Sequence, residues 1–535
     1  MFCLDLKGFI NAKIYASFKP LRVFEGFIVA GDKVVYAGSS VEVKQVVESL
    51  GGRIIDLKNK VVLPGFIDSH LHLDSLGLTL VSLDLRGVRS ISELKEKLRM
   101  YSETTKFKWV IGRGWDQEML LEKRYPTRLD LDEVVKDKPA VLLRTCGHAA
   151  VLNTKALELT GLINYVGKEV EKSTDGYPTG VIYEEAVGIA MAKFAESISI
   201  EEYVELLRVA QNHLVSQGVT SIGFMSCSLK SLKALLEMWV RNELKIRVRV
   251  YLNPMDNNLN LIETLKSLGL KRGFGGKYLK IMGFKLYADG SLGARTAWLT
   301  QPYNDDSSKT GYPAIDPYYL REIAKIIDEA GLQLAIHAIG DRAVEEVLGI
   351  YRELNNTRSL RHRIEHVSLL RDDQLLELSN SGAVAVVQPH FIVSDWWADR
   401  RLGPSRIKWL YRFKSMIESN VRVAFSTDAP VEPVNPWETV YAAVTRGKYD
   451  NLPFYREILH ESLDVLEALH SYTYGSAYAI HEEDVLGSLL PGFYADFVVL
   501  DKDPLETPDN QLKDIKILET YVGGVKVWRF PSNGA

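Results

Sequence analysis

Residues that could bind a metal recur at the ends of short apolar segments. His70 and His72 are two residues apart in Asp68-Ser69-His70-Leu71-His72, and on an extended segment this spacing points both imidazoles to one face. The other candidates lie at or near the ends of later segments, and they are Lys285, His337, His366 and Asp428. Several imidazoles with a carboxylate suit a divalent ion of the zinc type. The pattern therefore predicts a metal site.

Each candidate taken alone has an ordinary structural explanation. An isolated histidine at a strand end often only hydrogen-bonds a loop, and Lys285 on a buried strand could be an ion-pair partner. Asp428 precedes Ala-Pro and could simply cap a turn or a helix. Taken together, these ionisable groups would each be costly to bury unpaired on separate strands. A shared metal removes that cost.

The apolar segments that carry these residues alternate with stretches of helical spacing. They are 61–68, 218–225, 245–252, 279–289, 332–340, 361–367, 383–389 and 422–430. Continuous apolar strands that alternate with helices indicate parallel strands buried on both faces. Eight strands close a (β/α)8 barrel, and barrel enzymes place their active sites at the C-terminal ends of the strands.

The fold class that we predict is α/β, a TIM barrel with a β-sandwich domain built from both termini. Residues 64–74 and 216–482 form the predicted barrel, and residues 1–63 and 483–535 form the sandwich. Residues 75–215 are too long for a barrel loop and are expected to form an inserted α/β subdomain after the first strand. Within the insert, the pattern predicts helices over 90–100 and 184–217 and a strand over 139–145.

Composition excludes several other classes of protein. The 535 residues are 46% hydrophobic and 25% charged, and 65 Lys and Arg against 69 Asp and Glu give a net charge of −4. This balance gives no reason to expect nucleic acid or a membrane as partner. Three scattered cysteines (Cys3, Cys146 and Cys227) and the lack of a signal-peptide pattern favour a cytoplasmic protein. We expect a small-molecule substrate; the oligomeric state is left open, with a homodimer as one option.

Several motifs carry a resemblance to a known family. They are PGFIDSHLHL (64–73), FKLYADGSLGARTA (284–297), IHAIGDRA (336–343), HRIEHV (362–367), STDAPV (426–431) and LGSLLPGFYADFVVLD (486–501). Together they resemble the amidohydrolase superfamily of metal-dependent hydrolases. FKLYADGSLG and IHAIGDRA, with RGWDQ (113–117) and CGHAAVLNTKAL (146–157) in the insert, are most similar to its type 3 branch, which contains the N-substituted formamide deformylases.

The resemblance implies a set of metal ligands. His70, His72 and Asp428 would hold the more buried metal, a carboxylated Lys285 would bridge two metals, and His337 and His366 would hold the second. A lysine reacts with carbon dioxide only as the neutral amine, and desolvation on a barrel strand lowers its pKa in that direction. In the alternative, Lys285 is a plain ammonium paired with Asp289 or Asp428, and the site holds one metal.

The implied activity is metal-assisted hydrolysis of an amide-type C–N bond in an N-acyl, N-formyl or cyclic amide compound. Asp428 would act as general base and then as general acid. The first alternative is a mononuclear deaminase of a ring amidine, although the segment His337-Ala338-Ile339-Gly340-Asp341 lacks the glutamate expected for it. The second alternative is a catalytically silent binding protein.

Three residues are candidates for substrate contacts. His148 in the insert resembles a position that faces the active site in the family, and its alternative role is to cap a loop. Trp115 could wall an aromatic pocket or serve ordinary packing. Arg295 could bind a substrate carboxylate or phosphate, or pair with a nearby acid.

Overall fold

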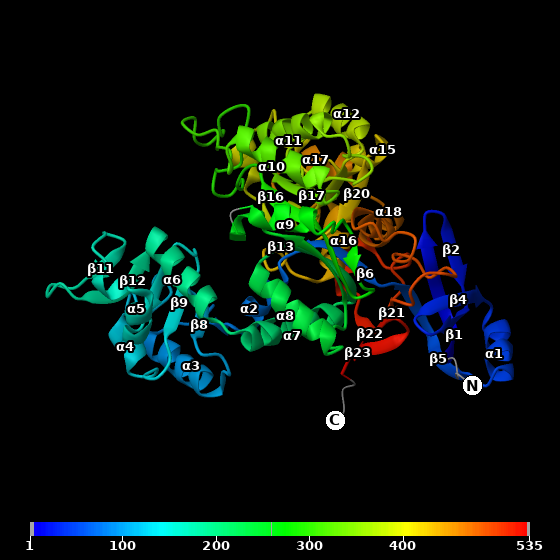
Figure 1. Ribbon diagram of the computed structural model, residues 1–535, viewed down its shortest axis with the longest axis horizontal. Helices are drawn as coiled ribbons and strands as arrows, with labels where there is room; N and C mark the ends of the chain where they lie inside the picture. The colour runs from blue at the N-terminus through cyan, green and yellow to red at the C-terminus, as the bar shows by residue number, and fades with distance from the viewer. Residues whose placement is uncertain (1–4, 258, 532–535) are drawn as a thin grey trace. The chain divides into compact units, whose positions relative to one another are not determined.

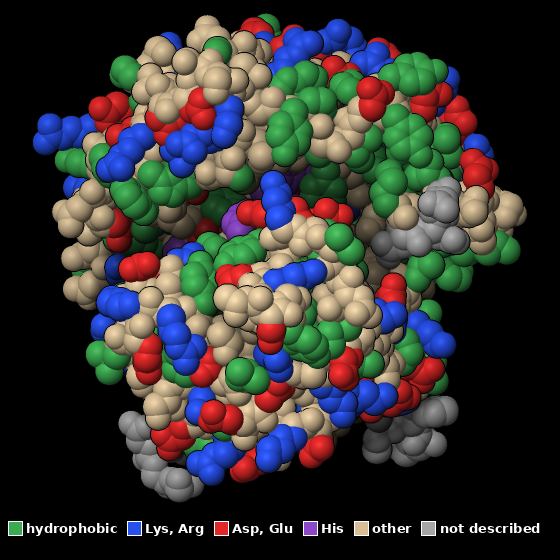
Figure 2. All heavy atoms as spheres, turned by 90° about the vertical axis from the view of Figure 1, so that its left-hand side faces the viewer, with side chains coloured by type: hydrophobic (Ala, Val, Ile, Leu, Met, Phe, Trp, Pro, Cys, Tyr) green, Lys and Arg blue, Asp and Glu red, His purple; other side chains and the backbone are tan. Residues whose placement is uncertain are grey.

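The computed structural model describes residues 5–257 and 259–531, so Cys3 lies outside the described residues. The chain forms two compact units. The first runs to Leu76 and resumes at Ala210, and the second is Gly77–Val209, compared with the predicted insert of 75–215. Within the described ranges, no helix is long and apolar enough to cross a membrane. On the face drawn in Figure 2, the described basic and acidic side chains are interspersed.

Eight parallel strands form the central sheet of the first unit (Figure 1). In spatial order they are β6 (Phe66–Leu71), β13 (Val219–Cys227), β14 (Arg247–Leu252), β16 (Leu279–Tyr287), β17 (Gln333–Ala338), β18 (Arg363–His366), β19 (Val384–Val387) and β20 (Arg422–Phe425). The short β15 (Phe274–Gly275) pairs antiparallel with β16. Each predicted apolar segment overlaps one of the eight strands, and the predicted TIM-barrel fold class is confirmed.

The first and last strands are joined just beyond their C-terminal ends. The amide of Asp428 donates to the carbonyl of His70 (2.8 Å), and the amide of His72 donates to the carbonyl of Ala429 (2.9 Å). These bonds link the end of β6 to the segment after β20. The ring of strands is therefore closed by the same residues that carry candidate ligands.

Helices follow the strands along the chain, and several of them pack against the strands (Figure 1). The main ones are α8 (Leu229–Val240), α9 (Asn260–Ser267), α10 (Pro317–Glu329), α11 (Asp341–Glu353), α12 (Asp372–Ser381), α15 (Phe413–Glu418) and α16 (Pro436–Thr445). In α10, Asp316 caps the N-terminus by accepting from the amide of Tyr319 (3.1 Å), and Pro317 occupies the first turn. The helix then buries Leu320 and Ile323. Local capping and periodicity thus fix its start and its buried face.

Both termini contribute to a second, mixed sheet. Its order is β23-β22-β21-β5-β1-β3-β4, with β2 paired to β1, and in Figure 1 the red C-terminal strands meet the blue N-terminal ones. The strands are β1 (Leu6–Phe18), β2 (Leu21–Phe24), β3 (Gly26–Ala30), β4 (Lys33–Gly38), β5 (Arg53–Pro64), β21 (Phe497–Leu500), β22 (Ile517–Val522) and β23 (Val525–Arg529), with helix α1 (Ser40–Ser49). Phe9, Phe27, Phe497 and Tyr521 form an aromatic cluster in its core.

The second unit has its own six-stranded sheet, of order β11-β12-β10-β9-β8-β7. Its strands are β7 (Leu83–Asp84), β8 (Val110–Trp115), β9 (Ala140–Arg144), β10 (Ala149–Leu152), β11 (Val170–Lys172) and β12 (Pro178–Tyr183), and its helices include α3 (Ile91–Thr104), α4 (Arg128–Asp132) and α5 (Thr154–Thr160). The single helix predicted over 184–217 is wrong, because α6 (Glu184–Ser197) ends before α7 (Ile200–Ser216) begins. Ser199 and Glu202 form a reciprocal capping box that starts a new helix.

A buried ion pair joins the barrel to the terminal sheet. Arg247 on β14 contacts both carboxylate oxygens of Asp496 (2.7 and 2.9 Å), and the two side chains are 0% and 4% exposed. The guanidinium also lies 3.8 Å from the centre of the Tyr494 ring. Asp496 in addition accepts from the amide of Gly523 (2.7 Å). Removing either charge leaves the other buried without a counter-charge.

We therefore expect Asp496→Asn to destabilise the fold by about 3–5 kcal/mol, the cost typical of breaking a buried pair. Thermal unfolding followed by circular dichroism measures the effect. The matched control is Arg352→Ala, which removes an exposed pair with Glu377 and is expected to cost under about 1 kcal/mol. Equal melting temperatures for the two variants would contradict the assigned role of the pair.

Candidate metal centre

Three candidate ligands converge at the C-terminal end of the barrel. Nε2 of His70 and Nε2 of His72 each lie 3.2 Å from Oδ1 of Asp428, and the three ligand atoms are within 4.8 Å of one another. His70 Nε2 and Asp428 Oδ1 are buried, and among the described residues neither has a hydrogen-bond partner. Buried polar atoms are normally paired. Two imidazoles and a carboxylate with orphaned ligand atoms therefore fit a divalent cation.

Two further histidines on neighbouring strands reach the same place. The ring centres of His337 and His366 are 4.3 Å apart, and those of His366 and His70 are 5.1 Å apart. His366 Nδ1 donates to the side-chain oxygen of Gln388 (2.7 Å), and His337 Nε2 donates to the carbonyl of Gly290 (2.9 Å). Each ring therefore keeps one nitrogen lone pair for a ligand.

Burial keeps both of these rings neutral. It lowers the pKa of His337 to about 3 and that of His366 well below its ordinary value. Neutral imidazole is the form that binds metals. The structure thus brings His337 and His366 to the His70, His72 and Asp428 cluster in a state that suits metal binding.

A buried chain of charges orients His70. Its Nδ1 donates to Oε2 of Glu365 (2.6 Å), and Glu365 accepts two bonds from Arg363 (2.7 and 2.9 Å). Burial raises the pKa of Glu365, but Arg363 and His70 outweigh it and hold that pKa at about 2. Such a carboxylate–histidine contact fixes the tautomer and leaves Nε2 free for a metal. Sequence reasoning missed this role, although Arg363-Ile364-Glu365-His366 places the two charged residues on one face of a strand.

The charges around His70 favour a cation at Nε2. Burial lowers the pKa of His70, but the carboxylates of Asp428 and Glu365 outweigh it, and the net shift is upward. Burial likewise raises the pKa of Asp428, and His70 with His72 reverses it to well below the ordinary value. In this electrostatic setting a divalent ion can replace the proton on His70.

Lys285 is buried on β16 without an ionic partner among the described residues. Its Nζ lies 3.6 Å from the centre of the Tyr287 ring. Asp289, one of the two acids considered as its partner, instead accepts from the backbone amides of Trp298, Ile339 and Gly340 (2.8–3.0 Å). The alternative in which Lys285 forms an ion pair with Asp289 or Asp428 is not found in this structure.

Two of the candidate ligands have strained backbones. Asp428 has φ of 59° and His366 has φ of 74°, both in the left-handed region that non-glycine residues rarely adopt. For Asp428, the bond from its amide to the carbonyl of His70 supports this conformation. Strain of this kind concentrates at functional sites.

An apolar cavity of about 290 Å³ opens beside these ligands. Its lining residues are Ser291, Leu292, Gly293, His337, Ile339, His366, Ser368, Phe391, Asp395, Trp397, Tyr411, Asp428 and Val431. A small, mainly apolar cavity with a few polar groups is typical of small-molecule sites. The aromatic residues Phe391 and Trp397 are part of its wall, whereas Trp396 is half exposed.

Each of the three residues considered for substrate contacts has a polar partner within its own unit. Arg295 makes a bidentate pair with Asp305 (2.9 and 3.1 Å), which is the structural pairing weighed for it. Trp115 is 1% exposed in the core of the insert, and its indole N–H donates to the carbonyl of Leu142 (2.8 Å). His148 is exposed, with Nδ1 3.1 Å from a carboxylate oxygen of Glu184.

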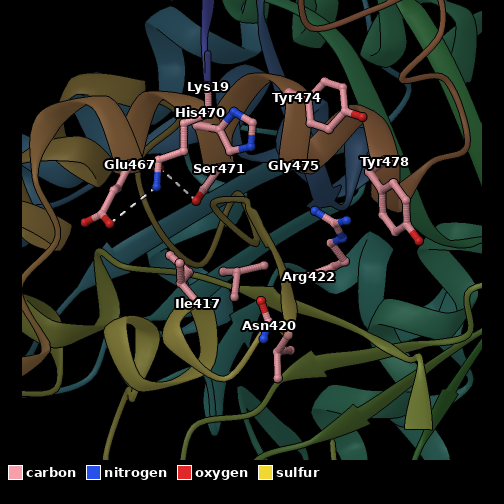
Figure 3. A pocket seen from close by; sticks show the side chains of 12 residues that line it. Lys19, Ile417, Asn420, Arg422, Glu467, His470, Ser471, Tyr474, Gly475 and Tyr478 are labelled. Atoms are coloured by element: carbon pink, nitrogen blue, oxygen red, sulfur yellow. Dashed lines mark hydrogen bonds and ion pairs between the residues drawn. The ribbon is translucent and has the colours of Figure 1, made fainter. Parts of the chain in front are cut away.

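A second cavity, of about 200 Å³, lies at the opposite end of β20 (Figure 3). Arg422, which begins the strand, lines it together with Lys19, Glu467 and His470. Nζ of Lys19 lies 3.4 Å from Oε1 of Glu467. Burial lowers the pKa of His470 to about 4. In the part of the chain that the structure describes, no three metal-ligating side chains gather there, so the metal centre is assigned to the other end of the barrel.

We expect Glu365→Gln to weaken divalent-metal binding by about 10- to 100-fold, because His70 loses its charged acceptor. Competition with a zinc chelator measures the affinity. Glu345→Gln, at an exposed glutamate of α11, is the control and should bind metal as the wild type does. Unchanged affinity in a folded Glu365→Gln variant would refute the orienting role.

Known proteins are similar to this chain over most of its length. A model of the amidohydrolase family matches residues 53–528. YtcJ of Bacillus subtilis (strain 168) is 32% identical over 92% of this chain and 93% of its own length. The N-substituted formamide deformylase of Arthrobacter pascens is 26% identical over 96% of this chain and 97% of its own.

A solved structure agrees with these matches. The crystal structure of an uncharacterized metal-dependent hydrolase from Pyrococcus horikoshii OT3 superposes with a TM-score of 0.85 at 43% identity, covering 94% of this chain and 99% of that one. The resemblance predicted from the motifs is confirmed by both kinds of match. The chain belongs to the amidohydrolase family.

Proposed function

We propose that this protein hydrolyses an amide-type C–N bond in an N-acyl, N-formyl or cyclic amide compound with the help of a divalent metal, of which zinc suits the donor set. One observation carries the proposal: His70 Nε2 and Asp428 Oδ1 are buried, lack hydrogen-bond partners in the described chain and face each other with His72 beside them. The deformylase among the relatives supports the choice of bond.

His70, His72 and Asp428 would hold the metal, with His337 and His366 next to them. A divalent cation there supplies Lewis acidity, which lowers the pKa of water and polarises a carbonyl oxygen. Asp428 accepts the proton of the attacking water and returns it to the leaving nitrogen. Glu365 and Arg363 hold the His70 ring in place, and the apolar wall that includes Phe391 and Trp397 excludes bulk water from the reacting bond.

A carbamate on Lys285 is a further part of the proposal. The side chain is buried and has no ionic partner among the described residues, and burying an unpaired ammonium is costly. Carbon dioxide reacts with an amine in its neutral form, and the product is a carbamate. The carbamate would supply two anionic oxygens, enough to bridge two cations.

Asp428→Asn is expected to lower kcat on N-formyl and N-acyl amides by at least about 10²-fold, because the base that moves the proton is lost. His70→Ala is expected to lower both metal content and turnover. A panel of amides assayed with the metal-loaded enzyme, with metal content measured by mass spectrometry, checks both. Near-normal turnover in either folded variant would overturn the assignment.

The Lys285 proposal predicts two metal ions per chain and reconstitution that depends on bicarbonate. Lys285→Met should reduce the bound metal to about one equivalent and abolish the bicarbonate effect, while Lys408→Met, at an exposed lysine, should change neither. One equivalent in the wild type, without a bicarbonate effect, would instead favour the mononuclear deaminase reaction. Hydrolysis of ring amidines with release of ammonia would then be the reaction to measure.

A further inference from the structure

One carboxylate in the cavity wall has no part in the metal centre. Asp395 directly follows the short helix α13 (Phe391–Ser394) and lines the same cavity as His337, His366 and Asp428. The hydroxyl of Tyr411 donates to its Oδ2 (2.6 Å). Among the described residues, Oδ1 of Asp395 has no donor. Asp395 therefore presents one free acceptor oxygen in the cavity wall.

The surroundings of Asp395 make a cationic ligand favourable. The apolar part of the wall is formed by Leu292, Ile339, Phe391, Trp397 and Val431. Asp395 is half-buried in these surroundings, so its carboxylate lacks part of the solvation that water would give it. A cation can restore that stabilisation, and an aromatic ring such as that of Phe391 also attracts positive charge.

Neighbouring acids do not compete for this role. Glu432 is buried nearby, but His390 Nδ1 and the hydroxyl of Ser394 (2.5 Å) already donate to its two oxygens. Asp428 faces His70 and His72.

Burial, with a smaller contribution from Glu432, raises the pKa of Asp395 to about 6. At neutral pH the carboxylate form of Asp395 therefore predominates.

We propose that Asp395 is a specificity residue that binds a cationic nitrogen of the substrate, so that the preferred substrate is an amide with an ammonium or amidinium group beyond the bond to be cleaved. The inference rests on the proposed function in one respect: it treats the bound cation as part of an amide substrate. The cation site itself depends only on the cavity. Tyr411 positions the carboxylate through its hydroxyl.

The test compares two compounds of equal size, N-(3-aminopropyl)formamide, which carries an ammonium, and N-butylformamide, which carries a methyl group in its place. The wild type should favour the charged compound by about tenfold or more in kcat/KM, mainly through KM, as a hydrogen bond between charged groups predicts. Asp395→Asn should abolish the preference, because kcat/KM for the charged compound falls. Tyr411→Phe should reduce the preference for the charged compound by a smaller amount. Asp373→Asn, at an exposed aspartate, should not alter that preference.

A binding measurement separates this inference from the proposed function. Calorimetry of the metal-loaded protein with butylammonium and with butan-1-ol should show about tenfold tighter binding of the ammonium in the wild type but not in Asp395→Asn. If neither formamide is cleaved but this difference holds, the cation site stands and the proposed reaction falls. Equal cleavage of both formamides, or ammonium binding that Asp395→Asn leaves unchanged, overturns the inference.

Discussion

Charge burial at one end of the barrel is the constraint on which the site depends. The groups gathered there would be costly to bury without partners, and the structure gives most of them one. Arg363 neutralises Glu365, Glu365 orients His70, and Gln388 orients His366. The atoms left over, His70 Nε2 and Asp428 Oδ1, are those that a cation would satisfy. Apart from the buried Lys285, these two atoms are what the pairing of charges within the described part of the chain leaves unsatisfied at this end of the barrel.

The backbone bonds that close the barrel also position the candidate metal ligands. The backbone bonds that connect β6 with the segment after β20 are made by His70, His72, Asp428 and Ala429. Residues more than 350 positions apart in sequence are therefore held in register by the ring of strands. The strained backbone of Asp428 is tolerated because that closure supports it. Loss of closure would displace the ligands together.

The metal ligands and the wall of the neighbouring cavity come from different parts of the fold. The ligands come from strand ends, whose positions follow from the barrel, whereas the wall of Phe391, Asp395 and Trp397 comes from a loop and short helices after β19. Elements of this kind vary without disturbing the barrel, which is how one fold serves different substrates. Asp395, with one oxygen held by Tyr411, is the acidic residue of that wall outside the ligand set.

Local pattern was enough for the parts of this protein that depend on neighbouring residues. Apolar runs and helical spacing identified the eight barrel strands, and the spacing of His70 and His72 indicated ligands, because strand periodicity is set within a few residues. Tertiary structure alone decided that Glu365 supports His70, that Arg295 binds Asp305 and that Trp115 is buried in the insert's core. These roles depend on contacts between side chains that lie on distant strands and loops. Such contacts cannot be predicted from a single sequence.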